Sequence, residues 1–220
     1  MNTKESIWYK HSSALIRSVL RLLHHWDFIL ESFLVLSILA GLTWYGHRTT
    51  SQEEQRIRDS VIYAAEQYIG CAEEDRSHSI IIDCYNRQDT LPRNYAMTYE
   101  DNWCAAFGTV AAMDAGMTDI IPAECSCQQQ ILLFDAIESW QEDECYLPRT
   151  GDYIYYVWDE WRKGDCTAWA SHVGIVVDTF GPIIKVIEGN KDDMVDYRYI
   201  FLNDICIRGF GLPDYRSLTQ

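Results

Sequence analysis

The sequence predicts an α+β protein, with helices packed on an antiparallel sheet and preceded in the chain by a single transmembrane helix. Three observations predict this class. An apolar run lies near the N-terminus, apolar residues then recur with a helical period between residues 51 and 139, and the pattern becomes that of β-strands from residue 152 onward. Helices followed by a run of strands are typical of α+β domains. A length of 220 residues suits one domain with an appended segment.

The N-terminal region is predicted to bind and cross a membrane. Residues 1–27 contain recurring Lys and Arg beside apolar positions that fit an amphipathic helix on an anionic membrane surface. Residues 28–46 form an apolar run near the length of about 20 residues that spans a bilayer. The long basic flank favours a retained anchor over a cleaved signal peptide or a buried helix. Its charge places the N-terminus in the cytoplasm and the body of the chain outside the cell membrane.

Three helices are predicted after a linker at residues 47–54. They span about 51–70, 103–116 and 127–139, where apolar residues recur every three or four positions. Asp101 or Asn102 is expected to cap the second helix, because both side chains accept hydrogen bonds from backbone N–H groups.

The second half of the chain is predicted to form an antiparallel run of strands. A turn around residues 180–182 joins two of them, and antiparallel pairing centred on Phe180 places His172 directly opposite Glu188. Asn190 then points to the same side, and a bulge at Gly181 would shift this register by one or two residues. The expected strands span residues 152–158, 172–179, 183–188, 197–202 and 205–210.

Cys104, His172 and Glu188 together have the residue types of a cysteine-nucleophile site. In the first turn of a helix, Cys104 meets unpaired N–H groups and the positive end of the helix dipole, which favour a thiolate. His172 would take the thiol proton, and Glu188 would orient the imidazole, with Asn190 as a substitute or a supplement. A buried or disulfide-bonded Cys104 is the competing interpretation.

Four segments carry a family resemblance, in the order NWCAAF (102–107), PRTGDYIYY (148–156), SHVGIV (171–176) and VIEGN (186–190). They resemble the successive motifs of CHAP domains, which are cysteine, histidine-dependent amidohydrolases/peptidases related to the NlpC-type papain-like cell-wall hydrolases. The resemblance covers about residues 55–215.

The resemblance implies a papain-like CHAP catalytic domain over residues 55–215. It implies Cys104 as nucleophile and His172 as base, with Glu188 and Asn190 as the orienting groups. Ala170 and Gly108 depart from the commoner family residues, and neither departure removes a catalytic group.

Peptidoglycan is the expected partner and substrate. The resemblance implies an N-acetylmuramoyl-L-alanine amidase or a peptidoglycan endopeptidase, and Trp103 and Trp169 are candidate substrate contacts. The alternative is a catalytically silent wall-binding or scaffold module with Cys104 in a disulfide. The bond that is cut and the oligomeric state stay open.

Composition excludes some other classes of function. A net charge of −15 repels phosphate backbones, so no nucleic-acid partner is expected. No CxxC pair and no EF-hand-like loop occurs, so the sequence indicates no metal site and no cofactor. Calcium dependence stays open. The disulfide pairing stays open for the cysteines, which stand at positions 71, 84, 104, 125, 127, 145, 166 and 206.

Overall fold

The computed structural model describes residues 52–143, 146–158 and 169–219. The predicted basic segment (1–27) and membrane anchor (28–46) lie outside these residues. Among the residues that are described, no helix is both long enough and apolar enough to cross a bilayer.

The described chain confirms the α+β class. Its α-helices are α2 (Gln52–Glu66), α3 (Ser79–Asn86), α4 (Cys104–Asp114) and α5 (Cys127–Ala136), with short 3-10 turns at η1 (Pro92–Asn94) and η2 (Tyr215–Thr219). The strands are β1 (Trp140–Gln141), β2 (Tyr153–Tyr156), β3 (His172–Phe180), β4 (Ile183–Lys191), β5 (Met194–Phe201) and β6 (Ile207–Gly211). They form one antiparallel sheet in the order β1-β6-β2-β3-β4-β5.

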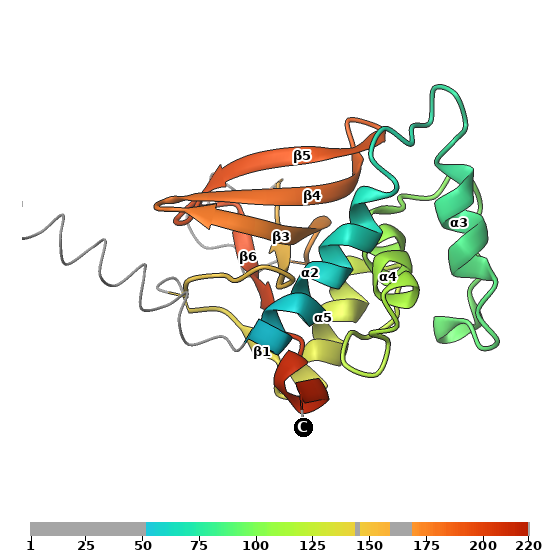
Figure 1. Cartoon of the computed structure of the whole chain (residues 1–220). Helices are drawn as coiled ribbons and strands as arrows, with labels where there is room; N and C mark the ends of the chain where they lie inside the picture. Colours follow the sequence, from blue (N-terminus) through green and yellow to red (C-terminus); the bar gives the residue numbers. More distant parts are fainter. Residues whose placement is uncertain (1–51, 144–145, 159–168, 220) are drawn as a thin grey trace, which may run out of the picture. The chain divides into compact units, whose positions relative to one another are not determined.

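Helix α4 lies at the centre of the helical layer. It contacts α2, α3 and α5 as well as strands β3 and β4, and Figure 1 shows α3 on the outside of this group. Every residue from Cys104 to Ala112 is buried. This agrees with the composition of α4, which is apolar on all sides, as expected of a helix surrounded by other elements.

The sheet is covered on both sides. Tyr153 and Tyr155 of β2 belong to the large core with the helices, whereas Ile154 and Tyr156 belong to a smaller apolar cluster on the other side. We call these the helix side and the outer side of the sheet. Because cross-strand partners share a side and His172 pairs with Tyr156, His172 lies on the outer side.

The register between β3 and β4 differs from the sequence prediction. Ile175 pairs with Ile187, whereas pairing about Phe180 would have placed it opposite Lys185. The turn consists of Gly181 and Pro182, and the register shifts again between Val176 and Asp178. The prediction that His172 directly faces Glu188 is therefore wrong by two positions.

The extra residue in β3 keeps Glu188 and His172 on the same side of the sheet. Phe180 pairs with Ile183, and continuing that register without a bulge would place Glu188 opposite Ile175, on the helix side. Val177 instead forms a bulge without a partner on β4, which shifts the pairing by one residue. Glu188 therefore lies on the outer side of the sheet, as His172 does.

A buried ionic network joins the first helix to the sheet. Arg58 of α2 donates to Glu54 at 2.9 Å and to Asp152 at 3.0 Å, and its guanidinium lies 4.5 Å from the centre of the Tyr215 ring. All three charged side chains are at most 6% exposed. Asp152, just before β2, thus has its charge compensated inside the protein.

Several element boundaries also differ from expectation. The first helix ends at Glu66 rather than near Gly70, and the third ends at Ala136 rather than at Ser139. Residues 71–102, which lie between the first two predicted helices, contain a further helix, α3. Strand β5 begins at Met194, directly after a turn in which Asp192 and Asp193 have positive φ angles.

Candidate active site

Cys104 is the first residue of α4 and is 4% exposed. The sequence prediction of its cap was wrong, because the N-cap residue is Trp103 and no described side chain caps this helix. Asp101 instead accepts hydrogen bonds from Thr98 and from Tyr95. The N–H groups of the first turn therefore keep their capacity to bind an anionic group.

His172 and Glu188 lie within hydrogen-bonding distance, as the sequence predicts. The Nε2 atom of His172 is 3.0 Å from Oε2 of Glu188, and both residues are buried. Gly174 makes this contact possible, because a Cβ there would lie 2.7 Å from Cγ of Glu188. Glu188 therefore passes over Gly174 to reach His172 from a position that is not directly opposite.

Arg198 is a member of this site that the sequence gives little reason to select. Its Nε donates to both carboxylate oxygens of Glu188 at 2.8 Å, and its guanidinium lies 4.8 Å from the centre of the Trp158 ring. Arg198 is on β5 and pairs with Val186 of β4. Because Val186 lies on the outer side of the sheet, Arg198 shares that side with Glu188. The only sequence signal for Arg198 would be the alternation of inward and outward side chains along a strand that begins at residue 194.

Two aromatic rings flank the imidazole of His172. The Tyr156 ring is stacked 5.9 Å from it, and Trp158 lies 6.3 Å away, tilted by 43°. Rings that pack against His172 restrict its rotation, so the histidine is held by packing as well as by Glu188.

The electrostatics of the site favour a thiolate and an imidazolium. A hydrogen bond from the Cys127 thiol lowers the pKa of Cys104 well below its ordinary value; burial opposes this shift, and His172 strengthens it. Burial alone would lower the pKa of His172, but its hydrogen bonds with Cys104 and Glu188 raise that pKa to about 9. Both shifts favour a Cys104 thiolate beside a protonated His172 near neutral pH.

Cys127 completes the group of side chains around Cys104, and no sequence pattern singles it out. It is the first residue of α5, and its Sγ lies 3.5 Å from Sγ of Cys104. The contact with Cys104 raises the pKa of Cys127 well above its ordinary value, and burial raises it further. Cys127 is therefore the protonated partner of the pair.

The other predicted site residues lie apart from this group. Asn190 has a positive φ of 54° and donates to Asn102 at 3.4 Å, so its amide is bonded to Asn102 rather than to His172. Trp103 is fully buried against Gly189, so it does not line an open groove. Trp169 is 76% exposed and is accessible to a large ligand.

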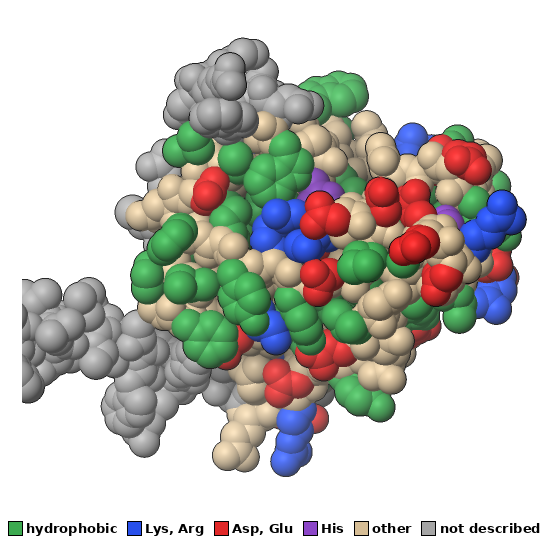
Figure 2. Space-filling view, turned by 90° about the horizontal axis from the view of Figure 1, so that it is seen from above, with side chains coloured by type: hydrophobic (Ala, Val, Ile, Leu, Met, Phe, Trp, Pro, Cys, Tyr) green, Lys and Arg blue, Asp and Glu red, His purple; other side chains and the backbone are tan. Residues whose placement is uncertain are grey.

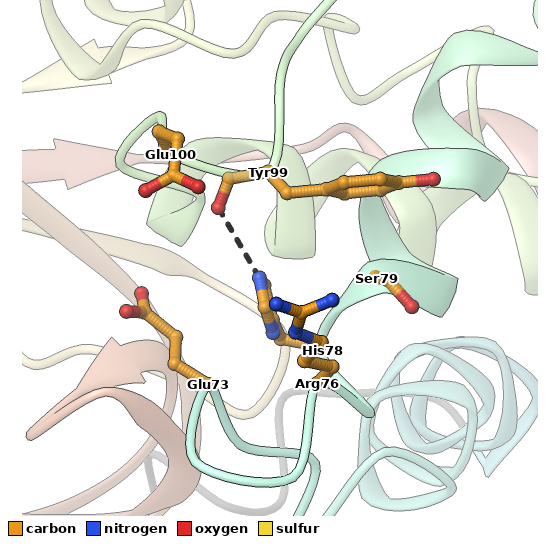
Figure 3. Close-up of a pocket in the computed structure, with 6 residues that line it drawn as sticks. All are labelled: Glu73, Arg76, His78, Ser79, Tyr99 and Glu100. Carbon is orange, nitrogen blue, oxygen red and sulfur yellow. Dashed lines mark hydrogen bonds between the residues drawn. The ribbon is translucent and has the colours of Figure 1, made fainter.

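A cavity of about 320 Å³ lies beside Trp103 rather than at Cys104. Figure 3 shows His78 pointing toward the backbone carbonyl of Tyr99, with Glu73 and Glu100 on the same side of the hollow. The Nε1 atom of Trp103 donates to Glu73 at 2.9 Å, and its ring stacks on His78. Trp103, the residue before Cys104, thus contacts two of the side chains that line the cavity.

The surface of the chain carries both signs of charge. On the face in Figure 2, acidic side chains are scattered among basic and hydrophobic ones. Within the described residues, no group of three or more His, Cys, Asp or Glu side chains is arranged to hold a metal ion.

Comparison with protein-family models and with curated proteins finds no match for this chain.

Proposed function

We propose that this chain is a membrane-anchored cysteine amidase or peptidase with a papain-like CHAP catalytic domain that hydrolyses amide bonds of peptidoglycan. The observation that carries the proposal is the contact between His172 and Glu188, together with Cys104 at an uncapped helix N-terminus. These groups supply a thiolate, a proton carrier and an orienting carboxylate, which are the parts of a cysteine-nucleophile mechanism.

Hydrolysis proceeds in two steps. The Cys104 thiolate attacks the amide carbonyl and forms a tetrahedral intermediate, and the imidazolium of His172 gives its proton to the departing amine as the C–N bond breaks. Neutral His172 then takes a proton from water, whose oxygen attacks the thioester carbonyl. The C–S bond breaks, the acid is released and the Cys104 thiolate is restored. Glu188 stabilises the charged imidazole throughout, as the acidic member of a triad does.

The oxyanion of the intermediate needs hydrogen-bond donors. The N–H groups in the first turn of α4 have no side-chain cap, so they can donate to an oxygen held close to Cys104. A capping Asp or Asn at the N-cap position would compete for these same groups.

The substrate class follows from the resemblance to CHAP domains and from the predicted anchor. An enzyme tethered outside the cell membrane reaches polymers that lie close to that membrane, and peptidoglycan is the amide-rich polymer found there. This argument applies to both the sugar–peptide amide and the bonds within the peptide, so the products must identify the bond.

The experiment is digestion of purified peptidoglycan by the full chain in detergent, with products identified by mass spectrometry. We expect new fragments from the parent protein under reducing conditions and none from the Cys104→Ala variant. Fragments of equal yield from both proteins would overturn the assignment of Cys104 as nucleophile.

The short distance between Cys104 and Cys127 supports a second candidate, a silent wall-binding module in which these cysteines form a permanent disulfide. Such a module would bind peptidoglycan in a sedimentation assay and release no fragments even with a reductant present. Release of fragments after reduction would reject it.

A further inference from the structure

Cys127 is a buried thiol to which the proposed hydrolysis assigns no step. It is 8% exposed, and its Sγ lies 3.5 Å from the Sγ of Cys104. Two thiols at this distance need only small side-chain movements to reach the separation of about 2.0 Å in a disulfide.

The segment that carries Cys127 is held in place by Glu124. This buried carboxylate accepts hydrogen bonds from the N–H groups of Cys125 and Ser126, and Arg93 binds it with two nitrogens at 2.8 and 2.9 Å. The backbone of Glu124 is also bonded to the Thr109 hydroxyl of α4. The beginning of α5 is thus attached to the helix that carries Cys104.

The other described cysteines have different surroundings. Cys125, only two residues away, lies 3.6 Å from Arg93. Cys84 contacts Tyr68 and Arg87, and Cys71 lies near Ser77. Cys206 directly precedes β6, and its N–H donates to Asp204. Within the described part of the chain, Cys127 is therefore the thiol placed to react with a modified Cys104.

We propose that Cys104 and Cys127 form an oxidative modification site, in which Cys127 converts a peroxide-oxidised Cys104 into a reversible disulfide. This inference concerns the same thiol as the proposed function, but it does not require that function to be correct. The oxidant belongs to the class of small hydroperoxides, because Cys104 is only 4% exposed and small molecules reach such a sulfur most easily.

The reaction has two balanced steps. The Cys104 thiolate attacks hydrogen peroxide, an S–O bond forms as the O–O bond breaks, and the departing hydroxide takes a proton to become water. Cys127 then attacks the Cys104 sulfur, an S–S bond forms as the S–O bond breaks, and the departing hydroxide leaves with the Cys127 proton as a second water. The two sulfurs together lose two electrons, and the peroxide gains them.

A disulfide of this kind protects the nucleophile. A sulfenic acid that meets no thiol is oxidised further to a sulfinic acid, which thiol reductants do not reverse. With Cys127 in contact, oxidation stops at a state that a reductant returns to two thiols. The nucleophile is inactive in that state, so hydrolysis depends on the redox conditions around the protein.

The test is exposure of the full chain in detergent to hydrogen peroxide, followed by alkylation and peptide mapping without reduction. We expect a crosslinked peptide pair containing Cys104 and Cys127 in the parent and in the Cys125→Ser control. In Cys127→Ser we expect Cys104 as sulfinic acid and at least a 10-fold loss of the fraction that dithiothreitol restores to thiol. Circular dichroism checks that this variant is folded.

Sulfinic Cys104 in the parent protein, or a crosslink from Cys104 to a different cysteine, would overturn the inference. The mapping needs no catalytic activity, so it can succeed where the peptidoglycan digestion fails. Conversely, a reduced protein that digests peptidoglycan but never forms the 104–127 crosslink would leave the proposed function intact and reject the modification site.

Discussion

The Nε atom of Arg198 lies 2.8 Å from each carboxylate oxygen of Glu188. His172 contacts the same carboxylate at 3.0 Å, so Glu188 is bonded to both His172 and Arg198. Arg198 does not contact Cys104 in any described interaction, so its effect on the reaction would pass through Glu188. In the proposed mechanism Arg198 is a positioning residue for His172.

Replacement of Arg198 by Met should slow hydrolysis of peptidoglycan. Loss of a hydrogen bond to a charged group costs about 1.5–3 kcal/mol, which corresponds to a roughly 10- to 100-fold lower rate. The pKa of His172 should also rise, because Glu188 no longer shares its charge with an arginine, and the alkaline limb of the pH–rate profile should move up. Lys185→Met, on the helix side of the same sheet, is the control and should leave the rate and the profile unchanged. An unaltered rate in Arg198→Met would contradict the positioning role.

A Cys104 thiolate beside a protonated His172 predicts a bell-shaped dependence on pH. The rate should fall as pH rises through about 9, because His172 then loses the proton that the leaving amine requires. It should also fall at acidic pH, as the Cys104 thiolate becomes protonated at a pKa well below the ordinary thiol value of 9.0.

Alkylation of Cys104 by iodoacetamide measures the thiolate directly, with the modified peptide quantified by mass spectrometry. The parent should react rapidly at neutral pH, where an ordinary thiol is largely protonated. His172→Asn should move the reaction toward alkaline pH. A parent profile that rises only near pH 9 would show that the ion pair does not form.

Replacement of Gly174 by Ala should separate Glu188 from His172. A Cβ atom at this position would lie 2.5 Å from Cγ1 of Val186 and 2.7 Å from Cγ of Glu188, so these side chains must move. We expect a loss of about 1–3 kcal/mol in the free energy of unfolding, typical of overpacking, and a large loss of activity.

The free energy of unfolding for Gly174→Ala is obtained from urea denaturation, and activity from release of peptidoglycan fragments. Thr179→Ala, half-buried near the other end of β3, serves as the control and should affect both properties little. Full activity in Gly174→Ala would mean that Glu188 can reach His172 by another path.

Arg58 and Arg56 form a matched pair for testing the buried network. Arg58→Met leaves Glu54 and Asp152 without their shared cation, and breaking a buried ion pair costs about 3–5 kcal/mol. Arg56, on the same helix, is 76% exposed, so Arg56→Met should change the free energy of unfolding by at most about 1 kcal/mol. Urea denaturation of both variants measures the difference, and equal midpoints would contradict a stabilising role of the network.

The sequence identifies the catalytic candidates because each occupies a recognisable local pattern. Cys104 precedes a run of small residues, and His172 and Glu188 stand in strands joined by a short turn with Gly181 and Pro182. Local patterns also predict the α+β class correctly, because the helical and strand periods are distinct along the chain.

Local sequence patterns do not predict which residues meet in the folded protein. Cys127 meets Cys104 because α4 and α5 begin at the same place in the fold, and nothing in the spacing of 23 residues indicates that contact. The predicted cap was wrong for a similar reason. Asp101 accepts hydrogen bonds from Thr98 and Tyr95, and Asn102 accepts one from Asn190. Polar side chains near a helix start have several competing partners, and the fold decides among them.

The irregularity at Val177 has a consequence for comparing this chain with distant relatives. His172 and Glu188 are 16 positions apart, and one intervening residue, Val177, is bulged out of the pairing between β3 and β4, so it does not change the side on which Glu188 emerges. A relative without that residue would carry the same two groups one position closer and still present them together. An alignment that demands a fixed spacing would score such a relative as lacking the acidic partner, so a one-residue gap between Val176 and Ile183 should carry no penalty.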